Sequence, residues 1–122
     1  MEGKETKLII KAKFDAAHFI PDHPHCGKVH GHCWHLTVAF QPKITDAAKI
    51  TVDFKVLKTV VRGVLDRLDH TLINDLIEIP SAENISSFIF QDLKSVLISS
   101  NVPATVSSVN VWETEECGVS YP

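Results

Sequence analysis

The sequence predicts an α+β fold in which an antiparallel sheet carries two helices on one face. Apolar and polar residues alternate over 6–18, 30–40 and 107–113. Apolar residues recur at helical spacing over 53–69 and 81–97. Alternation is typical of strands with one buried face, and the longer spacing is typical of amphipathic helices. Because strands and helices are grouped along the chain, the order ββααββ favours an α+β arrangement over a parallel α/β sheet.

The first two strands have their apolar side chains at even positions, and a polar loop joins them. Lysines separate the apolar residues of 6–18, and the apolar set of 30–40 follows two histidines. The loop over 21–28 is rich in Pro, His and Gly, and it is too long for a tight hairpin turn. Loops of this kind often carry functional residues. Residues 50–52 are expected to extend the sheet as a further short strand.

The two helices have recognisable starts and buried stripes. The first helix is expected from Asp53 to about Asp69, and the second begins at Ser81, a good N-cap directly after a proline. Residues 101–103 end the second helix, and strands over 107–113 and 118–121 complete the fold. One sheet with helices on one face leaves two free edges, which predicts assembly into an oligomer.

The composition is that of one soluble domain spanning residues 1–122. Hydrophobic residues make up 44% of the chain and charged residues 22%, with a formal net charge of -3. These values are ordinary for a globular protein. Without a basic patch, a nucleic-acid partner is not expected, and no apolar stretch is long enough to span a membrane. The start of the chain lacks the apolar run of a signal peptide, so we expect a cytoplasmic protein whose three cysteines are thiols.

Three histidines lie in phase with the apolar faces of the first two strands. His30 and His32 are two residues apart and project to the same face, and His18 continues the apolar phase of the preceding strand. A single histidine in such a place is usually a hydrogen-bonded core residue. If the strands pair, however, three neutral imidazoles converge, which favours a zinc site with three protein ligands and one open position.

A cysteine and an Asp-His pair could add acid–base chemistry to such a site. Cys26, in the loop before the second strand, could be a base or nucleophile, a fourth zinc ligand that closes the site, or an inert thiol. Asp69 and His70 follow the first helix, where a histidine is often only a cap. Beside a carboxylate, that histidine could also transfer protons.

Glu113 continues the apolar phase of the strand over 107–113. It is either a salt-bridged strand end or a carboxylate that accepts paired N–H donors from a guanidine-like heterocycle. His23, His25 and His35 are not expected to bind metal: His23 and His25 are interpreted as solvated loop side chains, and His35 lies on the more polar face of its strand.

Several segments together resemble the 6-pyruvoyltetrahydropterin synthase family, which includes the 6-carboxytetrahydropterin synthases of queuosine biosynthesis. The resemblance covers residues 7–121, in order, and rests on FDAAH at 14–18, CGKVHGH at 26–32, VDF at 52–54, LDHTLIN at 68–74, SAEN at 81–84 and WET at 112–114. It implies the tunnelling fold, in which ββααββ units assemble into barrels, commonly trimers stacked as hexamers.

The resemblance also implies roles for single residues. It places the zinc ligands at His18, His30 and His32, the catalytic base at Cys26, a proton relay at Asp69 and His70 that a neighbouring subunit typically supplies, and the pterin-anchoring carboxylate at Glu113.

The implied substrate is 7,8-dihydroneopterin triphosphate. The short chain favours the product 6-carboxy-5,6,7,8-tetrahydropterin, formed with release of acetaldehyde and triphosphate. The alternative reaction is triphosphate elimination to the 6-pyruvoyl product of the tetrahydrobiopterin pathway. An alternative of another class is a non-catalytic, zinc-stabilised assembly module in which Cys26 closes the metal site.

Overall fold

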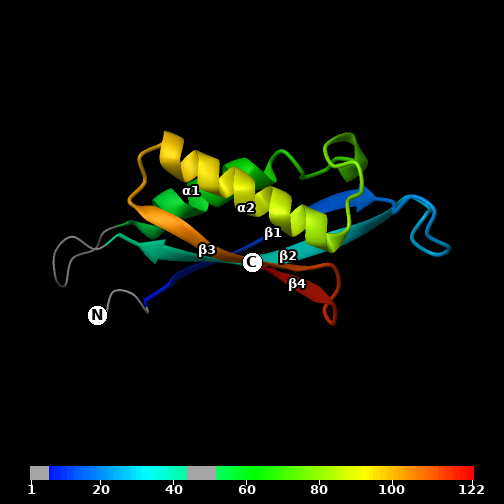
Figure 1. The fold of residues 1–122 in the computed structure, drawn as a ribbon, viewed down its shortest axis with the longest axis horizontal. Helices are drawn as coiled ribbons and strands as arrows, with labels where there is room; N and C mark the ends of the chain where they lie inside the picture. The colour runs from blue at the N-terminus through cyan, green and yellow to red at the C-terminus, as the bar shows by residue number, and fades with distance from the viewer. Residues whose placement is uncertain (1–5, 44–51) are drawn as a thin grey trace.

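The computed structural model describes residues 6–43 and 52–122. It contains a four-stranded antiparallel sheet in the order β1-β2-β3-β4 (Figure 1). The strands are β1 (Leu8–His18), β2 (His30–Pro42), β3 (Ala104–Trp112) and β4 (Gly118–Tyr121). Their order along the chain, with both helices between β2 and β3, confirms the predicted α+β arrangement. The expected strand over 50–52 falls mostly outside the described residues, and Val52 lies in a bend.

β3 begins earlier than the alternation predicts because a bulge changes its phase. The pairing register of β2 and β3 shifts between Ala39 and Phe40. On β3, Ala104 and Val106 are buried before the shift, whereas Val109 and Val111 are buried after it. A bulge inserts one residue and so reverses which positions face the core. Alternation traced back from Val109 therefore stops short of the true start of the strand.

Both helices cover one face of the sheet, as predicted (Figure 1). The helix α1 (Phe54–Leu65) is capped by the Asp53 side chain, which accepts a hydrogen bond from the Lys55 N–H. The helix α2 (Ala82–Ser99) is capped by the Ser81 hydroxyl, which accepts from the Asn84 N–H at 3.1 Å. α1 ends at Leu65 rather than near residue 69, because the chain tightens into turns there.

The core lies between the sheet and the helices, and one more short element borders it. Its fully buried large side chains include Trp34, Leu57, Ile89 and Leu93. A 3-10 helix, η2 (Ile73–Asp75), packs against β1 and was not predicted from the sequence. No helix in the described part of the chain is long and apolar enough to cross a membrane.

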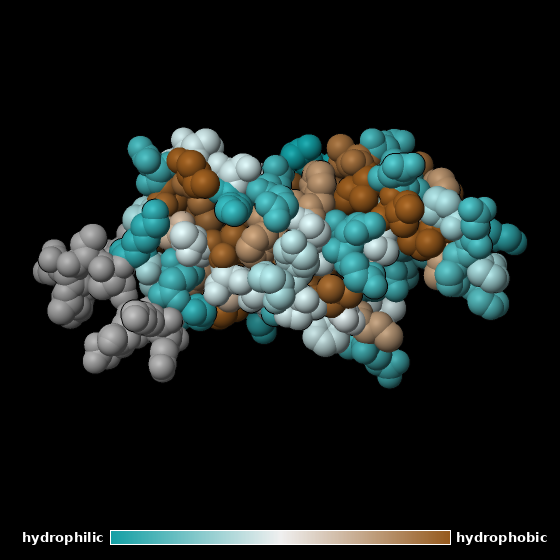
Figure 2. Space-filling model, viewed as in Figure 1, coloured by the Kyte–Doolittle hydropathy of each residue, from teal (hydrophilic) through white to brown (hydrophobic). Residues whose placement is uncertain are grey.

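Hydrophobic residues also reach the surface at both ends of the helical layer (Figure 2). Ile79, before α2, is 49% exposed, and Ile98, near its end, is 71% exposed. The sheet also has two edge strands, β1 and β4. Exposed apolar side chains and open strand edges are features of surfaces that contact a partner.

Candidate metal centre

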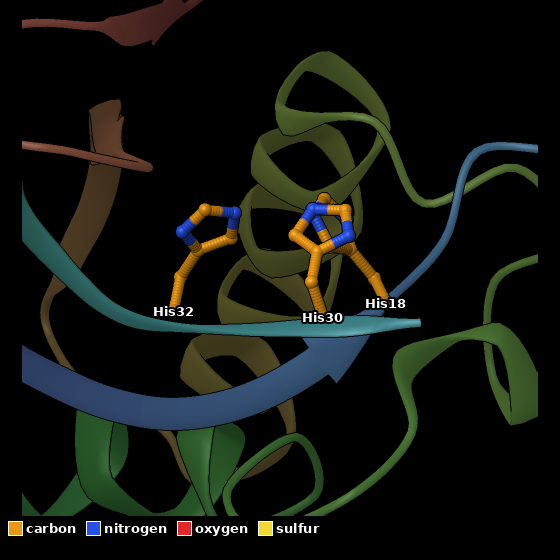
Figure 3. Close-up of side chains that lie close together, drawn as sticks. All are labelled: His18, His30 and His32. Atoms are coloured by element: carbon orange, nitrogen blue, oxygen red, sulfur yellow. The ribbon is translucent and has the colours of Figure 1, made fainter. Parts of the chain in front are cut away.

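Three histidine side chains meet where β1 ends and β2 begins (Figure 3). His18 pairs with His30 across the two strands, and His32 lies one pleat further along β2. The ring centroid of His18 is 4.6 Å from that of His30 and 5.3 Å from that of His32. One ligand atom from each ring lies within 4.8 Å of the others. The structure therefore brings together the three side chains that the alternation pattern selected.

Backbone carbonyls orient two of the three rings. The Nδ1 of His18 lies 2.8 Å from the carbonyl oxygen of Pro80, and the Nδ1 of His30 lies 2.7 Å from that of Lys28. Because a carbonyl only accepts, each Nδ1 must carry the proton and donate it. The Nε2 atom of each of these neutral rings then carries a lone pair that can bind a metal. Carbonyls that hold the second nitrogen in this way are typical of metal-binding histidines.

The buried nitrogen atoms of the cluster fit a metal ion. His18 is 1% exposed, and the Nε2 atoms of His18 and His32 are buried without a hydrogen-bond partner. Burial lowers the pKa of His32, the nearby His18 and His30 lower it further, and the Glu113 carboxylate partly opposes them. A lowered pKa keeps the imidazole neutral, which is the form that binds metal. Unsatisfied buried lone pairs are costly, and a divalent cation would satisfy them.

The buried indole of Trp34 borders the histidines on the side of the hydrophobic core. Its ring centroid is 5.0 Å from that of His18 and 5.2 Å from that of His32. The side chain is fully buried, and its Nε1–H donates to the carbonyl of Ala16 at 3.3 Å. This buried ring limits how far the imidazoles of His18 and His32 can turn away from each other.

The Glu113 carboxylate lies beside the histidine cluster. Glu113 follows the last residue of β3, and its backbone N–H donates to the carbonyl of Cys117 at 3.0 Å. Its Oε2 is 3.3 Å from the Nε2 of His18 and 3.6 Å from that of His32. With 31% of its side chain exposed, the carboxylate is accessible to solvent as well as to the cluster. The sequence predicted a carboxylate on this face but not its contact with the histidines.

Cys26 lies in the loop between β1 and β2 and is half-buried. Within the described residues, its sulfur is not part of any group of ligand atoms close enough to share a metal. The grouped ligand atoms are therefore three histidine nitrogens without a sulfur.

The Asp69–His70 pair belongs to a separate group at the edge of β1. Asp69 Oδ1 accepts from the Asp15 N–H at 2.9 Å and lies 3.1 Å from the Nδ1 of His70. The His70 N–H donates to the Asp15 carbonyl, and His70 has a φ of 59° with 78% of its side chain exposed. Asp15, Asp69 and His70 form one group of potential ligands, and His18, His30 and His32 form another. Within one chain, Asp69 is thus fixed to the backbone of β1, and the His70 side chain is largely exposed.

The Asp69 carboxylate should make stability depend on pH. The Asp15 N–H lowers the pKa of Asp69 most strongly, burial opposes it, and His70 and Arg62 each add a smaller lowering effect. A lowered carboxyl pKa stabilises the fold above the unfolded value of about 4, and this contribution is lost as pH falls through the folded value. We expect Asp69→Asn to unfold more easily than the parent at pH 7, with the difference shrinking as pH falls below the unfolded value and through the lowered folded value. Urea unfolding at several pH values tests this, with the more exposed Asp66→Asn as control, and parallel curves would contradict it.

Two further residues that shape the site were missed by the sequence analysis. Asn74 holds the backbone of Phe19, donating to its carbonyl at 2.9 Å and accepting from its N–H at 3.0 Å. His23 is exposed, as predicted, but its ring also accepts two backbone hydrogen bonds in the Cys26 loop. Asn74 lies in the LDHTLIN segment of the family resemblance, which is the one signal that could have indicated it.

The sheet, its one-sided helices and the histidine cluster define a tunnelling-fold protein with a candidate three-histidine metal centre. The chain belongs to the 6-pyruvoyl tetrahydropterin synthase family, whose model matches residues 7–122.

Similar proteins fall within this family. A protein of Archaeoglobus fulgidus named as a candidate 6-carboxy-5,6,7,8-tetrahydropterin synthase is 45% identical over 90 residues, covering 74% of this chain and 77% of that protein. A dihydroneopterin monophosphate aldolase of Pyrococcus furiosus is 34% identical over 117 residues, covering 94% and 96%. The structure of Caenorhabditis elegans 6-pyruvoyl tetrahydropterin synthase superposes with a TM-score of 0.80 at 22% identity, covering 95% of this chain and 94% of that one. The structural similarity confirms the tunnelling fold.

Proposed function

We propose that the protein is a zinc-dependent lyase that converts 7,8-dihydroneopterin triphosphate to 6-carboxy-5,6,7,8-tetrahydropterin, releasing acetaldehyde and triphosphate. The observation that carries this proposal is the pair of buried, unpartnered Nε2 atoms of His18 and His32, with Glu113 beside them. Family membership and the name of the Archaeoglobus fulgidus relative support the choice of substrate and product.

His18, His30 and His32 would hold the zinc ion through Nε2. When bound, zinc supplies a Lewis acid that acidifies the hydroxyl and C–H protons of the substrate side chain. The protein's contribution is to hold three neutral imidazoles in place, two of them, His18 and His30, through the carbonyls of Pro80 and Lys28. An open fourth position is what separates a catalytic zinc centre from a structural one.

The remaining site residues are proposed to move protons and bind the pterin. The Cys26 thiolate takes a proton from the substrate, and His70, oriented by Asp69, shuttles or donates one. The Glu113 carboxylate accepts paired N–H donors from the amino-pyrimidine edge of the pterin, as charge-assisted hydrogen bonds. Its exposure to both solvent and the histidine cluster is compatible with that role.

The separation of His70 from the histidine cluster supports a site shared between subunits. We propose that His70 and Asp69 serve the metal centre of a neighbouring copy in a cytoplasmic hexamer built as a dimer of trimers. Mixing inactive Cys26→Ala with inactive His70→Ala chains should then restore part of the activity, because some sites would contain both intact groups. If mixed oligomers with verified subunit exchange stay inactive, the thiol and the relay belong to one chain.

A second candidate reaction is an aldolase cleavage of dihydroneopterin monophosphate. The Pyrococcus furiosus relative of that name aligns with nearly the whole chain. Both reactions cleave a carbon–carbon bond of the pterin side chain, and both need the base and the metal centre described above. They differ in the phosphorylation of the substrate and in the products.

Incubating the zinc-loaded protein with each substrate separates these functions. The proposal predicts turnover of the triphosphate, with the carboxy product and acetaldehyde identified by mass spectrometry. A 6-pyruvoyl product would indicate the elimination reaction instead. Preferred turnover of the monophosphate to a hydroxymethyl pterin would establish the aldolase reaction. Zinc binding without turnover of either substrate would favour the non-catalytic assembly module.

A further inference from the structure

The loop that carries Cys26, residues 19–29, is closed by its own backbone. The Ile20 N–H donates to the Cys26 carbonyl at 2.7 Å, and the His23 N–H donates to the Ile20 carbonyl at 3.2 Å. These two bonds bring the start and the end of the turn together at Ile20. The position of Cys26 therefore depends on how the residues between Ile20 and Cys26 are held.

The exposed His23 imidazole holds that segment through two hydrogen bonds. Its Nδ1 lies 2.9 Å from the backbone nitrogen of Cys26 and 3.2 Å from that of His25, and it accepts a hydrogen bond from each N–H. An imidazole nitrogen accepts only when it is unprotonated, so His23 is neutral with its proton on Nε2. One side chain thus satisfies two backbone donors, one of which belongs to Cys26 itself.

The loop is also packed too closely to adopt this shape without glycine at position 27. A Cβ atom at Gly27 would lie 2.4 Å from the carbonyl oxygen of His23, a distance at which the backbone would have to shift. Asp22, in the same turn, has a φ of 65°. At the base of the loop, Asn74 fixes the backbone of Phe19 through two hydrogen bonds. The loop is therefore anchored at its base and shaped around His23.

We propose that His23 is a positioning residue that holds the Cys26 thiol in its working place through the Cys26 backbone N–H. This inference rests on the proposed function, since it assumes that Cys26 is the base. The hydrogen bonds accepted by Nδ1 hold the loop, and the rest of the ring is not required for this role. Asparagine places its Oδ1 where Nδ1 of histidine lies, at the same number of bonds from the backbone, so His23→Asn should preserve both hydrogen bonds.

The experiment compares His23→Ala, His23→Asn and the matched control His25→Ala, all loaded with zinc. The first readout is amide hydrogen exchange of the peptide covering residues 19–29, which reports loop opening without any substrate. In His23→Ala the His25 and Cys26 amides should exchange roughly tenfold faster or more, since an acceptor shared by both is lost. His23→Asn and His25→Ala should exchange like the parent protein.

The second readout is steady-state turnover of the pterin substrate. His23→Ala should lose about ten- to a hundredfold in kcat, because a displaced base no longer reaches its proton, while KM and zinc content stay close to the parent values. His23→Asn should recover most of the lost kcat. Unchanged exchange in His23→Ala, or equal loss in His23→Ala and His23→Asn, would overturn the proposal. Faster exchange with unchanged kcat would overturn the catalytic half of it, whereas a parent protein without turnover would refute the proposed function and leave the exchange result standing.

Discussion

Replacing Cys26 with alanine is expected to lower kcat by roughly 10²–10⁴-fold while each chain keeps its zinc ion. This range is the usual contribution of a positioned general base. The metal should remain because the candidate ligand group consists of three histidines and does not include the Cys26 sulfur. Single-turnover kinetics and metal analysis of the same preparation measure both quantities.

Cys117→Ala is the matched control for this prediction, since Cys117 is an exposed thiol outside the loop. It should retain parent turnover and parent zinc content. Near-normal turnover of Cys26→Ala to the same product would make Cys26 a bystander. Loss of zinc from Cys26→Ala would instead show that the thiol is a fourth ligand and that the centre is closed.

Replacing Glu113 with glutamine is expected to raise KM by roughly 10- to 100-fold. A hydrogen bond to a charged group contributes about 1.5–3 kcal/mol, which corresponds to that change in affinity. The amide keeps one acceptor oxygen but loses the charge and the second acceptor, so it no longer pairs with two adjacent N–H donors. Substrate titrations and equilibrium binding of an unreactive pterin measure the effect.

The contact of Glu113 with two histidines gives this variant a second outcome. If Glu113 only anchors the pterin, Glu113→Gln should bind zinc as tightly as the parent. A large loss of zinc affinity with an unchanged KM would show that the carboxylate, 3.3 Å from the Nε2 of His18, is a metal ligand instead. Glu116→Gln, in the following turn, is the control for a nearby surface carboxylate.

Most of the fold was predictable because each element carries its own periodic signal. Alternation identified the strands and, through strict phase, placed His18, His30 and His32 on one face before any pairing was known. A local irregularity is what the pattern did not reveal. The bulge opposite Ala39 reverses the phase of β3.

The parts of the site that were missed depend on contacts between distant segments. The Nδ1 bond of His18 reaches Pro80, and the side chain of Asn74 reaches Phe19. Neither contact leaves a periodic trace in the sequence, because each depends on how the chain packs after the strands have formed. The hydrogen bonds of His23 were missed for a related reason, since they are local but follow from the shape of one particular turn.

Removal of the metal tests the central claim that the three histidines hold a catalytic zinc ion at an open site. The zinc-loaded protein is treated with a chelator, and product formation and far-UV circular dichroism are followed on the same sample. We expect turnover to be lost, the dichroism spectrum to be largely retained, and added zinc to restore activity. Unfolding on chelation would contradict it, because a centre whose removal unfolds the chain is structural, and so would full turnover by metal-free protein.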